Sequence, residues 1–548
     1  MHHLPSFSNK KYTLFIFVLV SLCASCDDWQ KKVNAPPAAF VSFSDKLKTV
    51  LKPVDTAGKK NMKTVSFDVR KTYQGRNYMP IWVKENYAPT EASDKLIAEL
   101  EDMQWDGLNP ERYNLATIKL LKQRLDTTKH NSLQDAITFD TTLTHSYLAA
   151  AKDLLFGIIS PKKADSLWFH VNDTVWNAPY LLATKDHYTS LSEYRSEVPA
   201  YLLLRSEYRR YASLANDTDL NKTIAALHYT KHPDSVQTEQ VNTVIKTELP
   251  WITTAPSDTM SEQVQLITAY QNYSGIRVTG KLDSNTFVHL ATPPADFLKK
   301  LNANMERIRW MQRQFGDLYL LVNVPLMELF LKKAGVNEMH MRVVVGKPER
   351  QTPSLFATMA NIVINPSWGV PPTILKKDVL PGLKKSGRKY MRKKGLKVYD
   401  SDGDVVDPSF INESNYTRYT YKQAPGDDNS LGYVKFNLPN PWDIYLHDTP
   451  HREDFVKRDR FLSSGCIRVQ YPQEMAIYIL SGIENKHTYT PGRLDSMIAT
   501  HKTRWEILKT RIPVHIAYLT AYEDTTGKHI QFVRDIYGRD EKLISLLN

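Results

Sequence analysis

The sequence predicts an α+β multidomain protein, with a helical part first and a β-rich part after about residue 300. Between residues 46 and 235, apolar residues recur at spacings of three and four, for example over 93–103 and 143–156, which is the period of an amphipathic helix. Beyond residue 300, short β-rich segments alternate with turn residues, as at 318–324, 341–345, 361–365, 433–436 and 444–446. The chain of 548 residues is also too long for a single hydrophobic core.

The composition is that of a globular protein, with 42% hydrophobic and 24% charged residues, and it argues against extensive disorder. The formal net charge of +12 is compatible with nucleic acid, an anionic membrane or an anionic polymer as partner, and charge alone does not choose among them. The sequence contains no nucleic-acid recognition motif. It also lacks metal-ligand spacing, a phosphate loop and a dinucleotide fingerprint. We therefore expect no nucleic-acid partner, no metal and no cofactor.

Residues 1–26 have the plan of a secretory leader. Two lysines precede an apolar run at 14–22, which is shorter than the roughly 20 residues that a membrane-spanning helix needs. The run ends in Ala24, Ser25 and Cys26, which resemble the lipobox of bacterial lipoproteins, where the cysteine is lipidated. We therefore expect an exported, periplasmic protein with a lipid anchor at Cys26 and a tether over 27–45. Plain cleavage and an uncleaved anchor are the alternatives.

The cysteine count singles out one residue of the folded body. Of the three cysteines, Cys23 and Cys26 lie in the leader, so an exported body keeps Cys466 as its only thiol and cannot form an internal disulfide. An unpaired thiol in an oxidising compartment is a liability unless it has a function. A buried, inert core cysteine is the alternative, and the residues around Cys466 argue against it.

Residues near Cys466 have the chemistry of nucleophilic catalysis. His447 ends a strand-like segment 19 residues earlier, and a hairpin-like return would bring its imidazole to the thiol, whose proton it can take. Gly465 lets the backbone approach a substrate carbonyl, and N–H groups around Gly465 and Cys466 could bind a developing oxyanion. Arg468 lies two residues further, on the same side of an extended segment, where it could hold a substrate carboxylate.

These residues resemble the signature of the YkuD-type L,D-transpeptidases, a histidine followed by serine-x-glycine-cysteine-x-arginine. Here the histidine is His447 and the second string is Ser463-Ser464-Gly465-Cys466-Ile467-Arg468. Most of that family has histidine directly before the glycine, whereas this chain is similar to a large exported subgroup in having Ser464 there. No role is therefore expected for a second histidine. Tyr445 and Ser464 complete the candidate oxyanion or substrate-binding residues.

Further strings match the large subgroup and extend the resemblance over most of the mature chain. They are ERIRW at 306–310, VNVP at 322–325, VVGK at 344–347, QTP at 351–353, NPSW at 365–368 and DIYG at 535–538, with weaker matches at 78–82 and 106–108. The resemblance implies a helical scaffold domain, placed here at 46–235. It also implies a β-sandwich-like catalytic domain, placed at 300–548, and a mobile lid, placed at about 370–430.

The lid region contains a strongly basic stretch at 376–397. It has ten lysines and arginines and one acid, Asp378. We expect these charges to help to dock the anionic wall polymer over the active site. A solvated surface loop is the alternative.

Residues 236–295 form a smaller predicted unit. Residues 264–273 have a helical pattern, and 282–286 begin another helix with Asp283 or Ser284 as its cap. Together with Gly275 and Gly280, these strings resemble the small three-helix peptidoglycan-binding domain. A plain helical linker domain is the alternative.

The resemblance implies a two-step reaction on peptidoglycan stem peptides. The Cys466 thiolate attacks the carbonyl of the third residue of a tetrapeptide stem, and the terminal D-alanine leaves. The side-chain amine of another stem's third residue then attacks the thioester, which gives a 3→3 cross-link. In this family the second nitrogen of His447 is usually oriented by a backbone carbonyl rather than by Asp448, and carbapenems are the inhibitor class.

Two other hypotheses stay open. With water as the acceptor, the same acyl-enzyme would make the protein an L,D-carboxypeptidase that trims stem peptides. A non-catalytic wall-binding lipoprotein is the alternative outside enzymes, and the presence of His447, Gly465, Cys466 and Arg468 argues against it.

Overall fold

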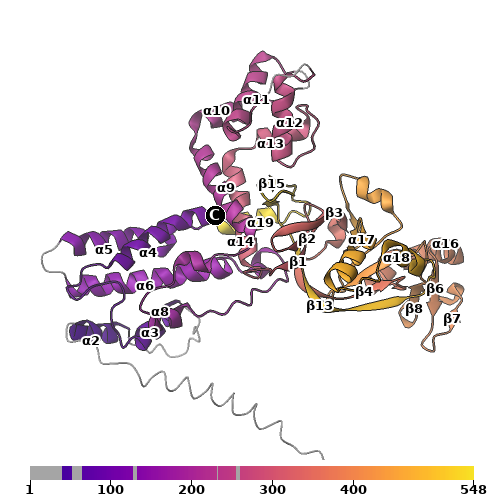
Figure 1. The fold of residues 1–548 in the computed structure, drawn as a ribbon, viewed down its shortest axis with the longest axis horizontal. Helices are drawn as coiled ribbons and strands as arrows, with labels where there is room; N and C mark the ends of the chain where they lie inside the picture. Colours follow the sequence, from indigo (N-terminus) through magenta and orange to yellow (C-terminus); the bar gives the residue numbers. More distant parts are fainter. Residues whose placement is uncertain (1–39, 52–64, 128–131, 231–232, 255–258) are drawn as a thin grey trace, which may run out of the picture. The chain divides into compact units, whose positions relative to one another are not determined.

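The structure, a computed structural model, describes residues 40–51, 65–127, 132–230, 233–254 and 259–548. The predicted leader with its lipid-anchor residue Cys26, and most of the predicted tether, lie outside the described residues. None of the helices in the described ranges has the length and apolar character that crossing a bilayer requires. The chain divides into two compact units, one of residues 1–157 and 174–195, the other of residues 158–173 and 196–548 (Figure 1). The domain boundaries predicted at 235 and 295 remain predictions.

The first unit is helical, as the sequence predicted. Its helices are α2 (Val41–Val50), α3 (Val65–Gly75), α4 (Glu91–Asp102), α5 (Leu115–Thr127), α6 (Leu133–Phe156) and α8 (Ala178–Thr184), with the 3₁₀ turns η3 (Met103–Asp106), η4 (Pro110–Tyr113) and η5 (Leu191–Tyr194). The long α6 begins after Ser132, whose hydroxyl accepts the N–H of Asp135 and so caps the helix.

A buried carboxylate on α6 holds the segment that precedes α4. Asp140 Oδ2 accepts backbone N–H groups from Ile81 at 3.0 Å and from Trp82 at 2.7 Å, and the Tyr73 hydroxyl donates to Oδ1. The Trp82 indole donates to Thr144, one turn further along the helix. Burial raises the pKa of Asp140 to about 6. At neutral pH the carboxylate is therefore mostly charged, and its stability in the core depends on these donors.

The second unit begins with helices. They are α7 (Pro161–Ala164), α9 (Pro199–Asn216), α10 (Thr218–Ala226), α11 (Ser235–Glu248), α12 (Glu262–Tyr273), α13 (Ser284–Leu290) and α14 (Pro294–Arg309). Three of them, α11 to α13, fall in the region where a three-helix unit was expected. The cap of α13 is Asp283, which accepts the N–H of Thr286. That these helices form a peptidoglycan-binding domain remains a prediction.

The β-rich part is a nine-stranded sheet in the order β11-β3-β12-β10-β9-β4-β13-β1-β2. The strands are β1 (Leu318–Asn323), β2 (Glu328–Lys333), β3 (Val336–Gly346), β4 (Leu355–Ile364), β9 (Val434–Asn437), β10 (Leu446–His447), β11 (Phe461–Ser463), β12 (Ile467–Val469) and β13 (Arg504–Ala517). Strand β2 also pairs with β3, so the sheet closes on itself. The resemblance implied a sandwich, and this pairing makes one continuous hydrogen-bonded sheet instead.

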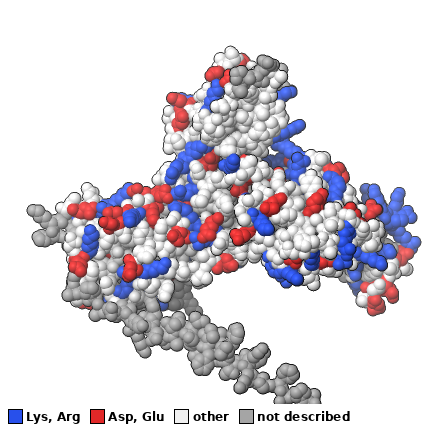
Figure 2. Space-filling view, in the orientation of Figure 1, with Lys and Arg blue, Asp and Glu red and all other residues white. Residues whose placement is uncertain are grey.

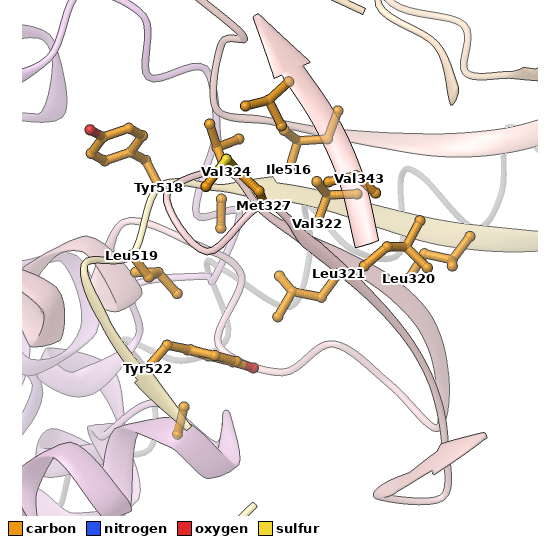
Figure 3. Packing of buried hydrophobic residues seen from close by; sticks show 14 of the residues in the cluster. Leu320, Leu321, Val322, Val324, Met327, Val343, Ile516, Tyr518, Leu519 and Tyr522 are labelled. Carbon is orange, nitrogen blue, oxygen red and sulfur yellow. The ribbon is translucent and has the colours of Figure 1, made fainter. Parts of the chain in front are cut away.

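The core of the second unit lies around β1. Leu320, Leu321 and Val322 follow one another along the strand and are all fully buried, which requires cover on both faces of the sheet. Figure 3 shows them among other buried side chains, including Val343 of β3 and Ile516 of β13. Six further elements complete the C-terminal part: α17 (Pro472–Ile477), the π-helix η11 (Tyr478–Ile483), α18 (Pro491–Ile498), the hairpin β14 (Ala521–Glu523) and β15 (Ile530–Phe532), and α19 (Asp540–Leu547).

The region predicted as a lid is a folded insert between β4 and β9. It contains α15 (Pro372–Ile374), the π-helix η7 (Leu375–Val379), α16 (Leu380–Lys393), and a sheet of β5 (Trp368–Gly369), β8 (Thr420–Gln423), β6 (Leu396–Tyr399) and β7 (Val405–Val406). Eight buried residues give it a core of its own: Leu375, Val379, Leu383, Met391, Leu396, Val398, Ile411 and Tyr421. The basic stretch lies on these helices and on β6, and is therefore not a loop. Figure 2 shows lysine and arginine side chains gathered around the insert, at the right of the view, where Figure 1 labels α16.

Replacing Asp140 with alanine should lower the free energy of unfolding of the first unit by about 3 kcal/mol, because two backbone donors and a hydroxyl would stay buried without an acceptor. Gln134 is exposed on the same helix and provides the control. Gln134→Ala should change the free energy of unfolding by less than about 0.5 kcal/mol. Urea titration followed by circular dichroism measures both variants. Equal losses in the two variants would contradict the role given to Asp140.

Candidate active site

Of the two predicted catalytic residues, His447 lies on strand β10 and Cys466 directly precedes the neighbouring strand β12. Strand β10 pairs in parallel with β12, with Leu446 opposite Ile467 and His447 opposite Arg468. Side chains alternate along a strand, so Leu446 and Ile467, both fully buried, face the core while His447 and Arg468 face the other way. The expected hairpin-like return is wrong, because these strands run in the same direction. Their connection passes through η10 (Arg452–Val456) and β11.

The side chains of the residues just before β10 and β12 lie on the same face of the sheet as His447 and Arg468. Tyr445 precedes β10 and Cys466 precedes β12, and the N–H of Ile467 donates to the carbonyl of Tyr445 at 3.2 Å. Tyr445 and His447 contact edge to face, with ring centroids 5.6 Å apart. Both of them line a cavity of about 490 Å³ together with Cys466 and Arg468. The parallel register therefore gathers four of the predicted site residues around one cavity.

A backbone carbonyl orients the imidazole of His447. Its Nδ1 lies 2.5 Å from the carbonyl oxygen of Asp448. A carbonyl can only accept, so Nδ1 carries the proton and Nε2 is the basic nitrogen of the neutral ring. Burial, with the charges of Arg468 and Lys435, lowers the pKa of His447 to about 3. The ring is therefore neutral near pH 7 and able to accept a thiol proton.

The carboxylate of Asp448 is used elsewhere. It accepts the N–H of Tyr433 at 2.8 Å and the N–H of Thr449 at 2.6 Å, and it forms an ion pair with Arg452 at 2.5 Å. These contacts fix the loop after β10 rather than the imidazole. The arrangement agrees with what the resemblance implied, a carbonyl in place of a triad acid.

The thiol of Cys466 is protonated in this arrangement. Its Sγ donates to the carbonyl of Asp443 at 3.6 Å. Burial raises the pKa of Cys466, and hydrogen bonds from Tyr445 and the charge of Lys435 offset part of that effect. Over the described ranges no hydrogen bond joins Sγ to His447. Transfer of the thiol proton to His447 would therefore need the thiol to rotate from the Asp443 carbonyl toward Nε2.

The backbone just before Cys466 is held by hydrogen bonds on both sides of the peptide. Gly465 has a φ of +122°, which residues with a side chain rarely adopt. Its carbonyl accepts the Thr352 hydroxyl at 2.8 Å, and its N–H donates to Ser463 Oγ at 3.1 Å. The Gly465 N–H, predicted as an oxyanion donor, is thus already used. The N–H of Cys466 remains as the backbone donor beside the thiol.

Ser464 connects the site to the insert. The Ser464 hydroxyl oxygen accepts a hydrogen bond from Nη1 of Arg350 at 2.9 Å. Nη2 of the same guanidinium donates to the Asp378 carboxylate at 2.8 Å. The hydrogen bonds between these two residues lower the pKa of Asp378 and raise that of Arg350. The single acid of the basic stretch therefore lies at the rim of the cavity, where it attaches the insert to the sheet.

The guanidinium of Arg468 already has a partner inside the protein. Its Nη1 donates to Asp454 at 3.0 Å, and burial lowers its pKa. Its predicted role, holding a substrate carboxylate, remains a prediction.

The insert lines part of the cavity, but most of its basic side chains are not among the lining residues. Eleven residues between the start of β5 and the end of β8 line the cavity: Trp368, Pro371, Pro372, Thr373, Ile374, Asp378, Val379, Tyr390, Lys394, Leu396 and Gln423. Of the ten basic side chains only Lys394 is among the lining residues, while Lys384 pairs with Glu413 and Arg388 with Asp407 inside the insert. Docking of a polymer by this stretch remains a prediction.

Three residues near the site were not expected from the sequence. Lys435 lies on β9 opposite His447, with Nζ 4.0 Å from the ring centroid of Tyr445. Thr352 and Arg350 come from the turn after β3. The alternation of buried Val434 with outward-facing Lys435 is a sequence signal that could have identified Lys435. No sequence signal identifies Arg350 and Thr352, which can be recognised as site residues only from the fold. Over the part of the chain that the structure describes, no group of three or more His, Cys, Asp or Glu is arranged to hold a metal ion.

Two family models match the chain. Residues 68–208 match the Scaffold domain and residues 317–506 match the L,D-transpeptidase catalytic domain; neither match includes 236–295. The chain is 33% identical over 252 residues to a curated Haemophilus influenzae protein named "Putative L,D-transpeptidase". The alignment covers 45% of this chain and 50% of that protein, so the chain spans about half the length of this relative. A solved structure of an avibactam carbamoyl enzyme shares 10% identity, with 57% of this chain and 98% of that chain covered, at a TM-score of 0.19.

A glycine next to Asp448 provides a test of the His447 geometry. Gly432 has a φ of +57°, and a Cβ there would lie 2.3 Å from Cγ of Asp448, whereas Gly403, with a φ of +90°, has nothing within 4 Å of its Cβ. Both alanine variants bear backbone strain, but only Gly432→Ala should displace Asp448 and with it the imidazole. We expect Gly432→Ala to slow alkylation of Cys466 by iodoacetamide at pH 7 about tenfold, as followed by intact mass. The same rate in both variants would contradict the proposed orientation of His447.

Proposed function

We propose that this chain, which carries an L,D-transpeptidase catalytic domain, forms 3→3 cross-links between peptidoglycan stem peptides through a thioester on Cys466. The observation that carries the proposal is the β10–β12 register, which gathers Cys466, His447 and Tyr445 around one cavity. The match of residues 317–506 to the catalytic domain supports the reaction class.

In the proposed acylation, Nε2 of His447 takes the proton of the Cys466 thiol, and the thiolate attacks the carbonyl carbon of the third residue of a donor stem. The N–H of Cys466 donates to the oxyanion that develops. His447 then gives its proton to the departing amine. The C–N bond breaks, D-alanine leaves, and the donor stem remains as a thioester.

The second step of the proposal returns the enzyme to its starting state. The side-chain amine of an acceptor stem attacks the thioester carbon, the C–S bond breaks, and the amine proton reaches the thiolate through His447. The insert lines part of the cavity in which this happens. Closure of the insert over the thioester would favour transfer to an amine over hydrolysis, because it would limit access of bulk water.

We further propose that the protein works outside the cytoplasm as a lipid-anchored lipoprotein. Support comes from the apolar run at 14–22 and from Ala24, Ser25 and Cys26. The proposed substrate is a wall polymer, which is reached only after export.

The proposed role of Cys466 predicts that Cys466→Ser abolishes product formation while the protein remains folded. Purified soluble protein incubated with tetrapeptide muropeptides should release D-alanine and give cross-linked dimers, as measured by mass spectrometry. The serine hydroxyl is a much poorer nucleophile than a thiolate, so the variant should yield neither product. Turnover in Cys466→Ser would refute the assignment. Tripeptide as the main product of the wild type would favour the carboxypeptidase instead.

A second prediction concerns carbapenems, the inhibitor class that the family resemblance implied. Incubation with a carbapenem should add the mass of one drug molecule, because the thiolate opens the strained β-lactam and stays acylated. The adduct should map to Cys466 by peptide mass spectrometry and be absent from Cys466→Ser. A catalytically active protein that gains no mass would contradict the proposal.

A third prediction concerns the anchor. In cells, Cys26→Ser should move the protein from the detergent-extracted membrane fraction to the soluble exported fraction, because the thiol that would carry the lipid is lost. Quantitative blotting of the two fractions measures this. A variant that stays entirely in the membrane fraction would show that Cys26 is not the anchor.

A further inference from the structure

Residues 158–173 fall within the match to the Scaffold domain, but they belong to the second unit. The chain leaves the first unit after residue 157 and joins it again at residue 174. Apart from α7, the backbone of this described segment is irregular. Its contacts with the rest of the second unit therefore fix its course.

Backbone hydrogen bonds attach this segment just before strand β4. The N–H of Ser354 donates to the carbonyl of Leu167 at 2.9 Å, and the N–H of Phe169 donates to the carbonyl of Ser354 at 2.7 Å. Trp168 and His170 are buried on either side of Phe169. Side chains alternate along an extended segment, so the Phe169 ring is directed away from these two.

The ring of Phe169 stacks on Trp442, in the turn that precedes β10. The two ring centroids are 4.1 Å apart, and the ring planes differ by 24°. Aromatic rings in such a stack attract each other beyond the burial of their surfaces. Trp442 is in turn one of the residues that line the cavity of Cys466. Phe169 therefore supports part of the cavity wall.

The turn that contains Trp442 also holds the thiol. The side-chain oxygen of Asn440 accepts the N–H of Trp442 at 3.0 Å and that of Ile444 at 3.2 Å. Between them, Asp443 has a φ of +53°, a conformation that is uncommon for residues other than glycine. Its carbonyl accepts the Cys466 thiol at 3.6 Å. Because Trp442 and Asp443 share a peptide bond, a shift of the indole would move this carbonyl.

We propose that Phe169 is a positioning residue of the active site, whose stack on Trp442 holds the Asp443 carbonyl where it accepts the Cys466 thiol. A residue of the Scaffold-domain match thereby takes part in setting the nucleophile. The inference rests on the proposed role of Cys466. The hydrogen bond favours the protonated thiol, because a thiolate has no proton to donate to a carbonyl.

The neighbouring residue Tyr445 is held without help from Phe169. Its carbonyl accepts the N–H of Ile467 at 3.2 Å, and its ring lies against two other residues of the site. Hydrogen bonds from Tyr445 lower the pKa of Cys466, whereas burial raises it. Loss of the stack should therefore release the Asp443 carbonyl and admit water while the Tyr445 hydrogen bonds persist. Both changes favour the thiolate.

The test follows alkylation of Cys466 by iodoacetamide as the pH is raised, by mass spectrometry of the peptide that contains it. The thiolate is the reactive form, so the midpoint of the profile reports the pKa of the thiol. Phe169→Ala removes the stacked ring and Phe169→Tyr keeps it. The matched control is Phe287→Ala, which removes another half-buried phenylalanine with an aromatic partner, Tyr229, at a centroid distance of 5.6 Å.

Phe169→Ala should lower the midpoint by at least about half a pH unit, the shift expected when one modest hydrogen bond to the thiol is lost. Phe169→Tyr and Phe287→Ala should keep the midpoint of wild type. A purely structural role would lower the melting temperature without moving the midpoint. An unchanged or raised midpoint in Phe169→Ala, or an equal fall in Phe287→Ala, would overturn the proposal. If Phe169→Ala does not fold, Phe169→Leu, which lacks only the flat ring, decides by the same criterion.

A double variant tests whether the effect passes through Trp442. Trp442→Ala should also lower the midpoint, and adding Phe169→Ala to it should cause no further fall, because both changes break the same stack. Additive falls would overturn the proposed route.

The release of D-alanine separates this inference from the proposed function. If wild type releases none from tetrapeptide stems, the proposed function fails, and the alkylation midpoints still decide whether Phe169 positions the thiol. If wild type is active and the midpoint of Phe169→Ala equals that of wild type, the positioning role alone is overturned.

Discussion

The parallel pairing of β10 with β12 is the constraint on which the site depends. Leu446 and Ile467 are fully buried opposite each other, and their burial fixes which face of each strand looks outward. A slip of one residue would bring His447 or Cys466 into the core and expose a leucine or an isoleucine. The burial of two side chains with no chemistry of their own therefore sets the position of Cys466 relative to His447.

The surroundings of Cys466 and His447 favour the neutral form of both side chains. Burial lowers the pKa of His447 to about 3 and raises that of Cys466. An ion pair between thiolate and imidazolium is thus disfavoured until a substrate changes the surroundings. The Asp448 carbonyl fixes the tautomer, and the charge of Lys435 lies near enough to lower the cost of forming the thiolate.

The sequence was sufficient for the parts of this account that depend on local pattern. It predicted the helical and β-rich parts and the cap at Asp283. It also predicted that the fold brings Cys466 and His447 close together. The hairpin was wrong, because whether two segments pair in parallel depends on contacts with β3 and β9, which spacing does not reveal. Lys435 and Arg350 were missed for the same reason. The insert was expected as a lid. Its own hydrophobic core was not predicted, because the apolar positions that form it are interspersed with many basic residues.

The claim that His447 is a neutral base oriented by a carbonyl can be measured directly. Nitrogen-15 NMR of histidine-labelled protein, with His447→Gln to assign the signals, reports the protonation of each ring nitrogen as the pH is changed. The account predicts a neutral ring at pH 7, protonated at Nδ1 and bare at Nε2, that does not gain a second proton until the pH falls toward about 3. A doubly protonated ring at pH 7, or a proton on Nε2, would contradict it.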